Sequence, residues 1–262
     1  MRRAAWLVLM MALGAPGVAR GHPEDPDQVY RVVLPVDVPI IAVLGVGALV
    51  PFAIASRIIQ PSCPCAASSV NAFDRGAIGN HSDLADWIST ATVVAAIGVP
   101  PLVDWFAVRR HRVWLDDAVV FAQTLSVNGA FVTLSKYTVQ RPIPRAYTDP
   151  QVAASPSSYR SFYSGHTAFA FAPLATAAVT ANLRYGLTWE PWVVTVLVGS
   201  SVAVERVVAG YHFPSDVLVG AAAGLVVGTA VPLLHARAPG LRVSVLRPAA
   251  GTGSVIALAG WF

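Results

Sequence analysis

The stretch "SFYSGHTAFAFA" (161–172) joins a polar Ser-Gly-His group to the start of a long apolar run. From Thr167 onward the residues are apolar enough to enter a membrane, where a spanning helix needs roughly 20 such residues. Ser164 is a typical N-cap residue for that helix. His166 is then either an incidental residue beside a helix cap or a functional group, and taken alone these twelve residues favour the incidental histidine.

The composition of the whole chain indicates a membrane protein. Of its 262 residues, 55% are hydrophobic and 12% are charged, whereas soluble domains carry about 25% charged residues. Six runs approach the length of a spanning helix: 36–56, 85–106, 114–136, 166–184, 190–208 and 214–235. We therefore expect an all-α, multi-helix transmembrane bundle of about five to six spans. The first run contains Pro39 and Pro51, so we expect it to be the least regular helix.

The two ends of the chain differ from this core. Residues 1–20 begin with two arginines after Met1, followed by an apolar stretch and then small residues, which is typical of a signal peptide or an N-terminal anchor. We expect residues 21–84 to form an exposed linker, an irregular apolar helix and a polar loop, and residues 85–237 to form the helical core. Residues 238–262 alternate apolar and polar residues around a Pro/Gly turn, which predicts a short C-terminal β-hairpin.

The basic residues indicate how the bundle crosses the membrane. The net charge of +4 is carried mainly by arginines at the ends of apolar runs, without a block long enough to suggest nucleic-acid binding. The basic loop 108–114 is expected to be cytoplasmic. Two crossings separate loop 137–165 from turn 209–213, so both lie on one face, which we expect to face the periplasm or the outside of a bacterial cell membrane. A cleaved signal would require the opposite orientation if 36–56 crossed fully, so one of these two assumptions must fail.

Polar residues stand at the ends of the last four apolar runs on this shared face. The set is Lys136, Arg141, Arg145, Ser164, Gly165, His166, Arg206, His212 and Asp216. A helix that begins at Ser164 offers free backbone N–H groups to an anion. Asp216 is expected to accept one ring N–H of His212, which leaves the other ring nitrogen as a nucleophile or base. The cations would neutralise a multiply charged oxyanion, so the set predicts a phosphoryl group as ligand.

Three motifs in this set resemble those of a known family. They are "RVVAGYHFPSD" (206–216), "YSGH" (163–166), and Lys136 with the following "YTVQRPIP". Over roughly residues 85–235 the chain resembles the type 2 phosphatidic acid phosphatase superfamily. The resemblance implies a phosphohistidine on His212 with Asp216 orienting the ring, and His166 as the general acid. It also implies that no metal or cofactor takes part, and that phosphate is held by Lys136, Arg206, Ser164 and the Gly165 backbone.

The first motif departs from the family at Ile143, where the resemblance implies an arginine. Arg141 and Arg145 stand two positions to either side. One of them is expected to replace the missing guanidinium, and we favour Arg141 slightly.

We expect a membrane phosphatase that hydrolyses a phosphomonoester or a diphosphate of a lipid or a small molecule. Two alternatives stay open: a phosphotransferase on the same scaffold, and a non-catalytic protein that binds phosphorylated ligands. The expected partners are the phosphorylated substrate and the membrane, without nucleic acid, and the oligomeric state is left open.

Overall fold

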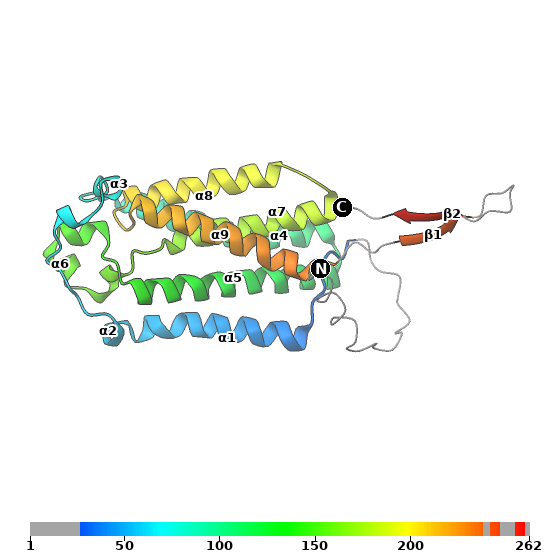
Figure 1. Ribbon diagram of the computed structural model, residues 1–262, viewed down its shortest axis with the longest axis horizontal. Helices are drawn as coiled ribbons and strands as arrows, with labels where there is room; N and C mark the ends of the chain where they lie inside the picture. The colour runs from blue at the N-terminus through cyan, green and yellow to red at the C-terminus, as the bar shows by residue number, and fades with distance from the viewer. Residues whose placement is uncertain (1–26, 238–241, 247–254, 260–262) are drawn as a thin grey trace, which may run out of the picture.

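The computed structural model of the protein describes residues 27–237, 242–246 and 255–259. Six long helices dominate this part of the chain: α1 (Leu34–Ala53), α4 (Asp83–Val108), α5 (His111–Val139), α7 (Gly165–Tyr185), α8 (Glu190–Val208) and α9 (Pro214–His235). The short elements are α2 (Ala55–Ile58), η1 (Ala67–Ser69), α3 (Ala72–Arg75), η2 (Pro144–Tyr147), α6 (Pro150–Ala153) and η3 (Pro156–Tyr159). The long helices lie side by side as a bundle, with α2, α3 and α6 together at one end (Figure 1). The expectation of a helical bundle is confirmed.

Within the described residues, five helices are long and apolar enough to cross a membrane. They are α1, α4, α8, α9 and the stretch His111–Tyr147 that contains α5. This number agrees with the expected five to six spans. The remaining long helix, α7, has 21 residues, which is about 30 Å of helix and therefore enough for a bilayer.

The helix α7 is less apolar because it occupies the centre of the bundle. It contacts α4, α5, α8 and α9, and many of its residues are small and buried, from Ala168 to Ala178. Polar side chains on α7 find partners inside the bundle: the Thr176 hydroxyl lies 3.1 Å from the carbonyl oxygen of Gly228 on α9. A helix covered on all sides needs no apolar surface toward lipid.

Three glycines on α9 allow this close packing. A Cβ at Gly220, Gly224 or Gly228 would lie 2.6, 2.7 or 2.3 Å from a backbone oxygen of Ser164, Ala168 or Ala172. The glycines are four residues apart, so they form one face of α9. Small residues at this spacing let two helix backbones approach closely in membranes. The contact fixes the start of α7 against the start of α9.

The segment 36–56 is more regular than we expected. It forms the continuous helix α1, although Pro39 and Pro51 lie inside it. Pro51 stands two residues before the end of α1, and α2 begins after Ile54. At the start, Pro35 occupies the first turn, where a missing N–H costs little, and the Asp37 carboxylate accepts the N–H of Val33 at 2.6 Å. The structure thus gives α1 the length of a full span.

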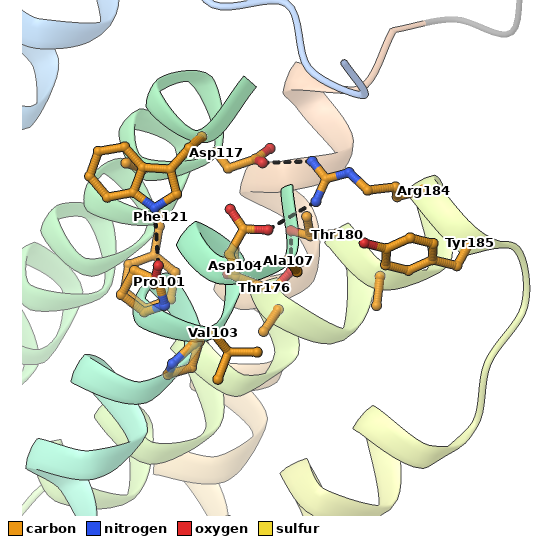
Figure 2. A pocket seen from close by; sticks show the side chains of 15 residues that line it. Pro101, Val103, Asp104, Ala107, Asp117, Phe121, Thr176, Thr180, Arg184 and Tyr185 are labelled. Carbon is orange, nitrogen blue, oxygen red and sulfur yellow. Dashed lines mark hydrogen bonds and ion pairs between the residues drawn. The ribbon is translucent and has the colours of Figure 1, made fainter. Parts of the chain in front are cut away.

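An ion cluster closes the opposite end of the bundle. Arg184 on α7 donates through Nη1 to Asp104 Oδ1 at 2.9 Å and through Nη2 to Asp117 Oδ2 at 2.6 Å. Figure 2 shows these three side chains pointing toward one another from α7, α4 and α5, beside a cavity of about 260 Å³. The cluster ties three helices together next to the basic residues Arg109, Arg110 and Arg112.

The chain ends were expected to hold a signal or anchor and a hairpin. Residues 1–20 lie outside the described residues. After α9, the segments β1 (Arg242–Leu246) and β2 (Val255–Ala259) are paired antiparallel, with Arg242 opposite Ala259. Because an isolated two-stranded hairpin is at best marginally stable in water, a stable hairpin stays a prediction.

Candidate functional site: a cationic cavity at one end of the bundle

Helix ends from four elements meet at the end of the bundle that carries α2, α3 and α6. The helices α5 and α8 end there, and α7 and α9 begin there. A cavity of about 790 Å³ at this end is lined by six residues of the predicted set, namely Lys136, Arg145, Gly165, His166, Arg206 and His212. The shared face expected for loop 137–165 and turn 209–213 is therefore present. Ser164, Arg141 and Asp216 lie behind this lining.

His212 stands in the turn between α8 and α9 and is almost fully buried, at 4% exposure. Its Nδ1 lies 2.7 Å from the carbonyl oxygen of Ser161. A neutral ring that donates Nδ1–H to this oxygen keeps the lone pair on Nε2. Burial lowers the pKa of His212 well below its usual value, and the charges of Lys136 and Arg206 lower it further. The ring is therefore neutral around pH 7, with Nε2 in the form of a nucleophile or base.

The orientation of His212 differs from the sequence expectation. Asp216 Oδ2 is 3.9 Å from Nδ1, which is too long for a hydrogen bond. The Asp216 carboxylate is occupied by other donors: Ser161 Oγ at 2.5 Å, the N–H of Phe213 at 2.9 Å and Arg141 Nη1 at 2.6 Å. Asp216 thus acts on His212 through Ser161, whose hydroxyl it holds while the Ser161 carbonyl faces the ring. Ser161 is the first residue of the stretch 161–172, but nothing in the sequence indicated that it connects Asp216 to His212.

His166 occupies the first turn of α7, directly after the cap. Ser164 is fully buried and caps the helix by accepting the N–H of Thr167. His166 Nε2 lies 3.2 Å from the hydroxyl of Thr90 on α4. Because that hydroxyl donates to the carbonyl of Asp86, its oxygen is free to accept an Nε2–H from the histidine. The second histidine is thereby fixed at the cavity wall.

Two cations from helix ends complete the inner part of the cavity. Lys136 is 7% exposed and its Nζ donates to the carbonyl oxygen of Arg160. Arg206 forms an ion pair through Nη1 with Asp86 on α4, and the same nitrogen lies 3.2 Å from Ser89 Oγ. Gly165 packs closely against α5: a Cβ there would lie 3.1 Å from a Val132 methyl and would make an ordinary contact, 3.5 Å, with Lys136 Cε. The role of Asp86 was not foreseen, because an acid in a first helical turn ordinarily serves the helix dipole.

The two candidate replacements for the missing arginine lie in different surroundings. Arg141 is bound behind the cavity by Asp74 and Asp216, at 2.8 and 2.6 Å, and stacks over the Phe213 ring. Arg145 lies in the cavity lining. The slight preference for Arg141 is therefore not supported by the structure. The physical reason is that Asp74, which arrives from a distant loop, captures Arg141.

Asp74 belongs to the polar loop before α4 and is fully buried. Burial alone raises its pKa, but hydrogen bonds from Arg141 and from Ser215 outweigh burial and lower the pKa to about 2. Its oxygens accept the Ser215 N–H at 2.9 Å and the Ser215 hydroxyl at 2.6 Å. The carboxylate stays ionised and holds the start of α9 against the loop that carries Arg141.

The cavity has two further walls of different character. One is apolar and is formed by side chains of α1, α4, α5 and α7, namely Phe52, Val93, Ile97, Val132 and Phe169. The other comes from the loop around η3 and carries hydroxyls and a guanidinium, from Ser155, Ser157, Ser158 and Arg160. The sequence did not single out Arg160 or these serines, because nothing local distinguishes them from an ordinary polar loop.

The charge of the lining suits an anion. Four cationic side chains and two imidazoles face the space, and the nearest carboxylates are engaged with arginines. Among the described residues, no group of three or more His, Cys, Asp or Glu side chains could hold a metal ion. A phosphoryl group is the ligand that this set of donors fits best.

Part of the chain is similar to known proteins. Residues 117–239 match the model of the PAP2 superfamily. Lipid A 1-phosphatase of Porphyromonas gingivalis is 34% identical over 121 residues, which are 45% of this chain and 24% of that protein. The chain thus spans about a quarter of the length of this curated relative. The crystal structure of LpxE from Aquifex aeolicus has a TM-score of 0.44 and 27% identity, and the match covers 62% of this chain and 92% of that chain.

Proposed function

Residues 117–239 belong to the PAP2 superfamily, as the three motifs predicted, and from this premise we propose that the protein is a membrane-bound lipid phosphatase. It hydrolyses a phosphomonoester or a diphosphate through a phosphohistidine on His212. The observation that carries the proposal is the single cavity in which two histidines and four cations meet an apolar wall.

The chemistry follows from the positions of the two histidines. His212 Nε2 attacks phosphorus, a nitrogen–phosphorus bond forms, and the bond to the leaving oxygen breaks while His166 protonates that oxygen. Water then attacks the phosphohistidine, with His166 accepting the water proton, and releases inorganic phosphate. Lys136, Arg206 and the Gly165 N–H stabilise the phosphoryl oxygens. Protein side chains and backbone atoms supply every group that these two reaction steps require, so we propose that the reaction needs no metal or cofactor.

A lipid substrate fits the apolar wall. Val93 and Ile97 lie on successive turns of α4, farther from the start of the helix than Asp86. The cavity therefore extends from the cations along the helices. An acyl or prenyl chain can lie there while its phosphate reaches the histidines. Three serines on the opposite wall suit a headgroup with hydroxyls, and the name of the Porphyromonas gingivalis relative indicates a phosphorylated glycolipid as one candidate.

Two observations support a site that faces the periplasm or the outside of a bacterial cell. Cys63 and Cys65 form a disulfide, and the N–H of Cys63 bonds to the hydroxyl of Tyr159 in η3, at the site end. Disulfides persist in oxidising compartments outside the cytoplasm. Arg109, Arg110 and Arg112 lie at the opposite end, as the positive-inside rule requires for a cytoplasmic loop. In this proposal, residues 85–237 form the catalytic core.

The test is phosphate release by the full chain purified in detergent. The substrates are phosphatidate, phosphatidylglycerophosphate, undecaprenyl diphosphate and lipid A. His212→Ala should abolish release, whereas His111→Ala at the opposite, exposed end should leave it unchanged and serves as the matched control. A single turnover with radiolabelled substrate, quenched in alkali, should trap label on the parent protein and none on His212→Ala.

His166→Ala separates the acid from the nucleophile. Its rate should fall strongly on lipid phosphates and much less on para-nitrophenyl phosphate, whose leaving group needs no proton. A transferase would instead give a phosphorylated product when a lipid or sugar alcohol is added. Absence of turnover on all substrates, together with phosphate binding, would leave the non-catalytic binding protein.

A further inference from the structure

The cavity wall contains an apolar residue where a cation is expected. Ile143 is 7% exposed and lines the cavity beside Lys136 and Arg145. Its N–H donates to the carbonyl of Ser158 at 2.8 Å, so this part of the loop is fixed in place. An isoleucine cannot bind an oxyanion, and the contact must come from elsewhere if the cavity holds a phosphoryl group.

One aromatic ring contacts two guanidinium groups at this wall. The Cζ atoms of Arg145 and Arg206 lie 4.4 and 4.5 Å from the centroid of the Tyr211 ring. Both distances are within the range of cation–π attraction, about 6 Å. Tyr211 therefore holds side chains from two elements, η2 and α8, next to each other. The ring also lines the cavity, directly before His212 in the chain.

Each arginine is anchored through part of its guanidinium and keeps a terminal nitrogen without a partner among the described residues, and Arg206 Nε also lacks a hydrogen bond. Arg145 Nε donates to the carbonyl of Ala209 at 2.7 Å, and its Nη2 lies 3.5 Å from Asp83 Oδ1. Arg206 is held through Nη1, as described above. Within the described residues, no hydrogen bond or ion pair uses Nη1 of Arg145 or Nη2 of Arg206. Two NH₂ groups on residues that line the cavity are thus available to a ligand.

The backbone around Gly210 is built to bring Arg145 to this position. Gly210 has φ +73°, a conformation that other residues rarely adopt. A Cβ there would lie 2.0 Å from the Asn80 oxygen and 2.9 Å from Arg145 Cγ. The Arg145 N–H also approaches the carbonyl of Gly210, at 3.3 Å. The turn after α8 therefore docks Arg145 by backbone and side chain together.

We propose that Arg145 and Arg206 bind the transferring phosphoryl group as a pair, with Tyr211 as the residue that positions both guanidiniums. Arg145 supplies from η2 the contact that Ile143 cannot make. The inference rests on the proposed function, since it assigns the second guanidinium of the same site. Without Arg145, the part of the wall formed by Ile143 would lack a cation of its own.

The decisive experiment removes the guanidinium of Arg145 and then places an arginine at position 143. Arg145→Ala should lower kcat/KM by about 10²–10³, the effect of removing one donor to the transition-state oxyanion. The double variant Ile143→Arg/Arg145→Ala should recover most of that loss, because the new side chain starts from the same cavity wall. Arg141→Lys serves as the comparison for a change behind the cavity, and thermal unfolding verifies that each variant is folded.

Two substitutions of Tyr211 separate the role of its aromatic ring from that of its hydroxyl. Tyr211→Phe should keep the parent kcat/KM, whereas Tyr211→Leu should lower it roughly tenfold, as expected when the ring contacts to two cations are lost. Binding of inorganic phosphate, measured by calorimetry, should weaken in Arg145→Ala and Tyr211→Leu and stay unchanged in Tyr211→Phe. A merely structural tyrosine would change the unfolding temperature without this selective loss of phosphate binding.

The outcomes separate the two proposals. Full activity in Arg145→Ala beside an inactive His212→Ala would overturn the pairing and leave the phosphatase assignment intact. Loss in Arg145→Ala without recovery in the double variant would overturn the replacement of the missing cation. If the parent protein turns over no substrate, the phosphatase assignment fails, and the calorimetric series still decides whether Arg145 and Tyr211 form the anion site.

Discussion

At His212, burial and the surrounding cations act in the same direction. Both lower the pKa of the imidazole well below 6.5, with burial the larger cause. The charged form is therefore disfavoured in the folded protein, and the neutral ring survives into acidic solution. This single side chain connects the packing of the turn after α8 to the pH range in which a nucleophile is available.

The pH dependence of turnover follows from that shift. kcat/KM on a phosphate ester should not decline near pH 6.5, the ordinary value for histidine, and should fall only at clearly lower pH. Protonation of His212 is also linked to folding: its contribution to stability is complete above pH 6.5 and is lost as pH falls toward the lower folded-state pKa. A half-maximal kcat/KM at pH 6.5 that persists in the control variant His111→Ala would contradict the neutral buried ring.

A second prediction concerns how stability depends on pH through Asp74, whose pKa is lowered in the folded protein. Its pKa of about 2, against 3.8 for an unperturbed group, corresponds to about 2 kcal/mol of stability above pH 4. That contribution is lost as pH falls from 4 to 2. Asp74→Asn should lower the unfolding temperature at pH 7 and flatten the loss of stability between pH 4 and pH 2, measured by thermal unfolding in detergent.

The sequence predicted which residues meet but not all of their partners. Lys136, His166, Arg206 and His212 stand at helix ends, so counting crossings was enough to bring them to one face. Arg141 and Arg145 lie in the irregular segment before η3, where two residues of displacement decide between a buried ion pair and the cavity wall. Ser161 contributes a backbone carbonyl, which no side-chain pattern can reveal.

At the scale of elements, the contact between α7 and α9 positions the site. The glycine face of α9 brings the first turn of each helix together, so the cap at Ser164 and the carboxylate of Asp216 share one small volume. The Ser164 N–H donates to the Asp216 carbonyl at 3.1 Å. Separation of the two helices would move His166 away from His212.

Gly228→Val tests this contact. The new side chain would meet the Ala172 carbonyl, 2.3 Å from the Cβ position, and overpacking of this kind costs about 1–3 kcal/mol or more. The unfolding temperature and the turnover should both fall. Gly98→Ala on α4, where a Cβ meets nothing within 4 Å, should be neutral or slightly stabilising. Equal behaviour of the two variants would refute the role of the glycine face.

The elements themselves were largely predictable. Apolar runs and caps located all six long helices closely, because hydrophobic length is the main signal in membranes. The regularity of α1 was missed: Pro35 lies in its first turn and Pro51 in its last, and the helix also continues through Pro39. The short helices α3 and α6 leave no periodic signal, and α3 is held by contacts of Asp74 with the distant Ser215.

For the whole molecule, the arrangement of the helices decides which compartment the cavity faces. The long helices alternate in direction, so the basic loop between α4 and α5 and the loop around η3 lie at opposite ends (Figure 1). The disulfide and the arginines support the same orientation, with the cavity outside the cytoplasm.

Single cysteines report this orientation directly. In intact bacterial spheroplasts, Ser157→Cys should react with a membrane-impermeant maleimide, because residue 157 lies in the loop that lines the cavity. Arg112→Cys, at the other end, should react only after the membrane is permeabilised. The native Cys63–Cys65 pair is oxidised and gives the background. The reverse pattern of labelling would place the cavity toward the cytoplasm.

The apolar wall formed by Val93, Ile97 and Phe169 has a kinetic consequence. A substrate whose tail rests on that wall never leaves its leaflet, so the protein meets it by diffusion in two dimensions. Supply is then set by the mole fraction of substrate in the surrounding lipid and not by its concentration in the bulk solution. Added inert phospholipid should slow turnover by surface dilution, while the same addition leaves a water-soluble phosphate ester unaffected.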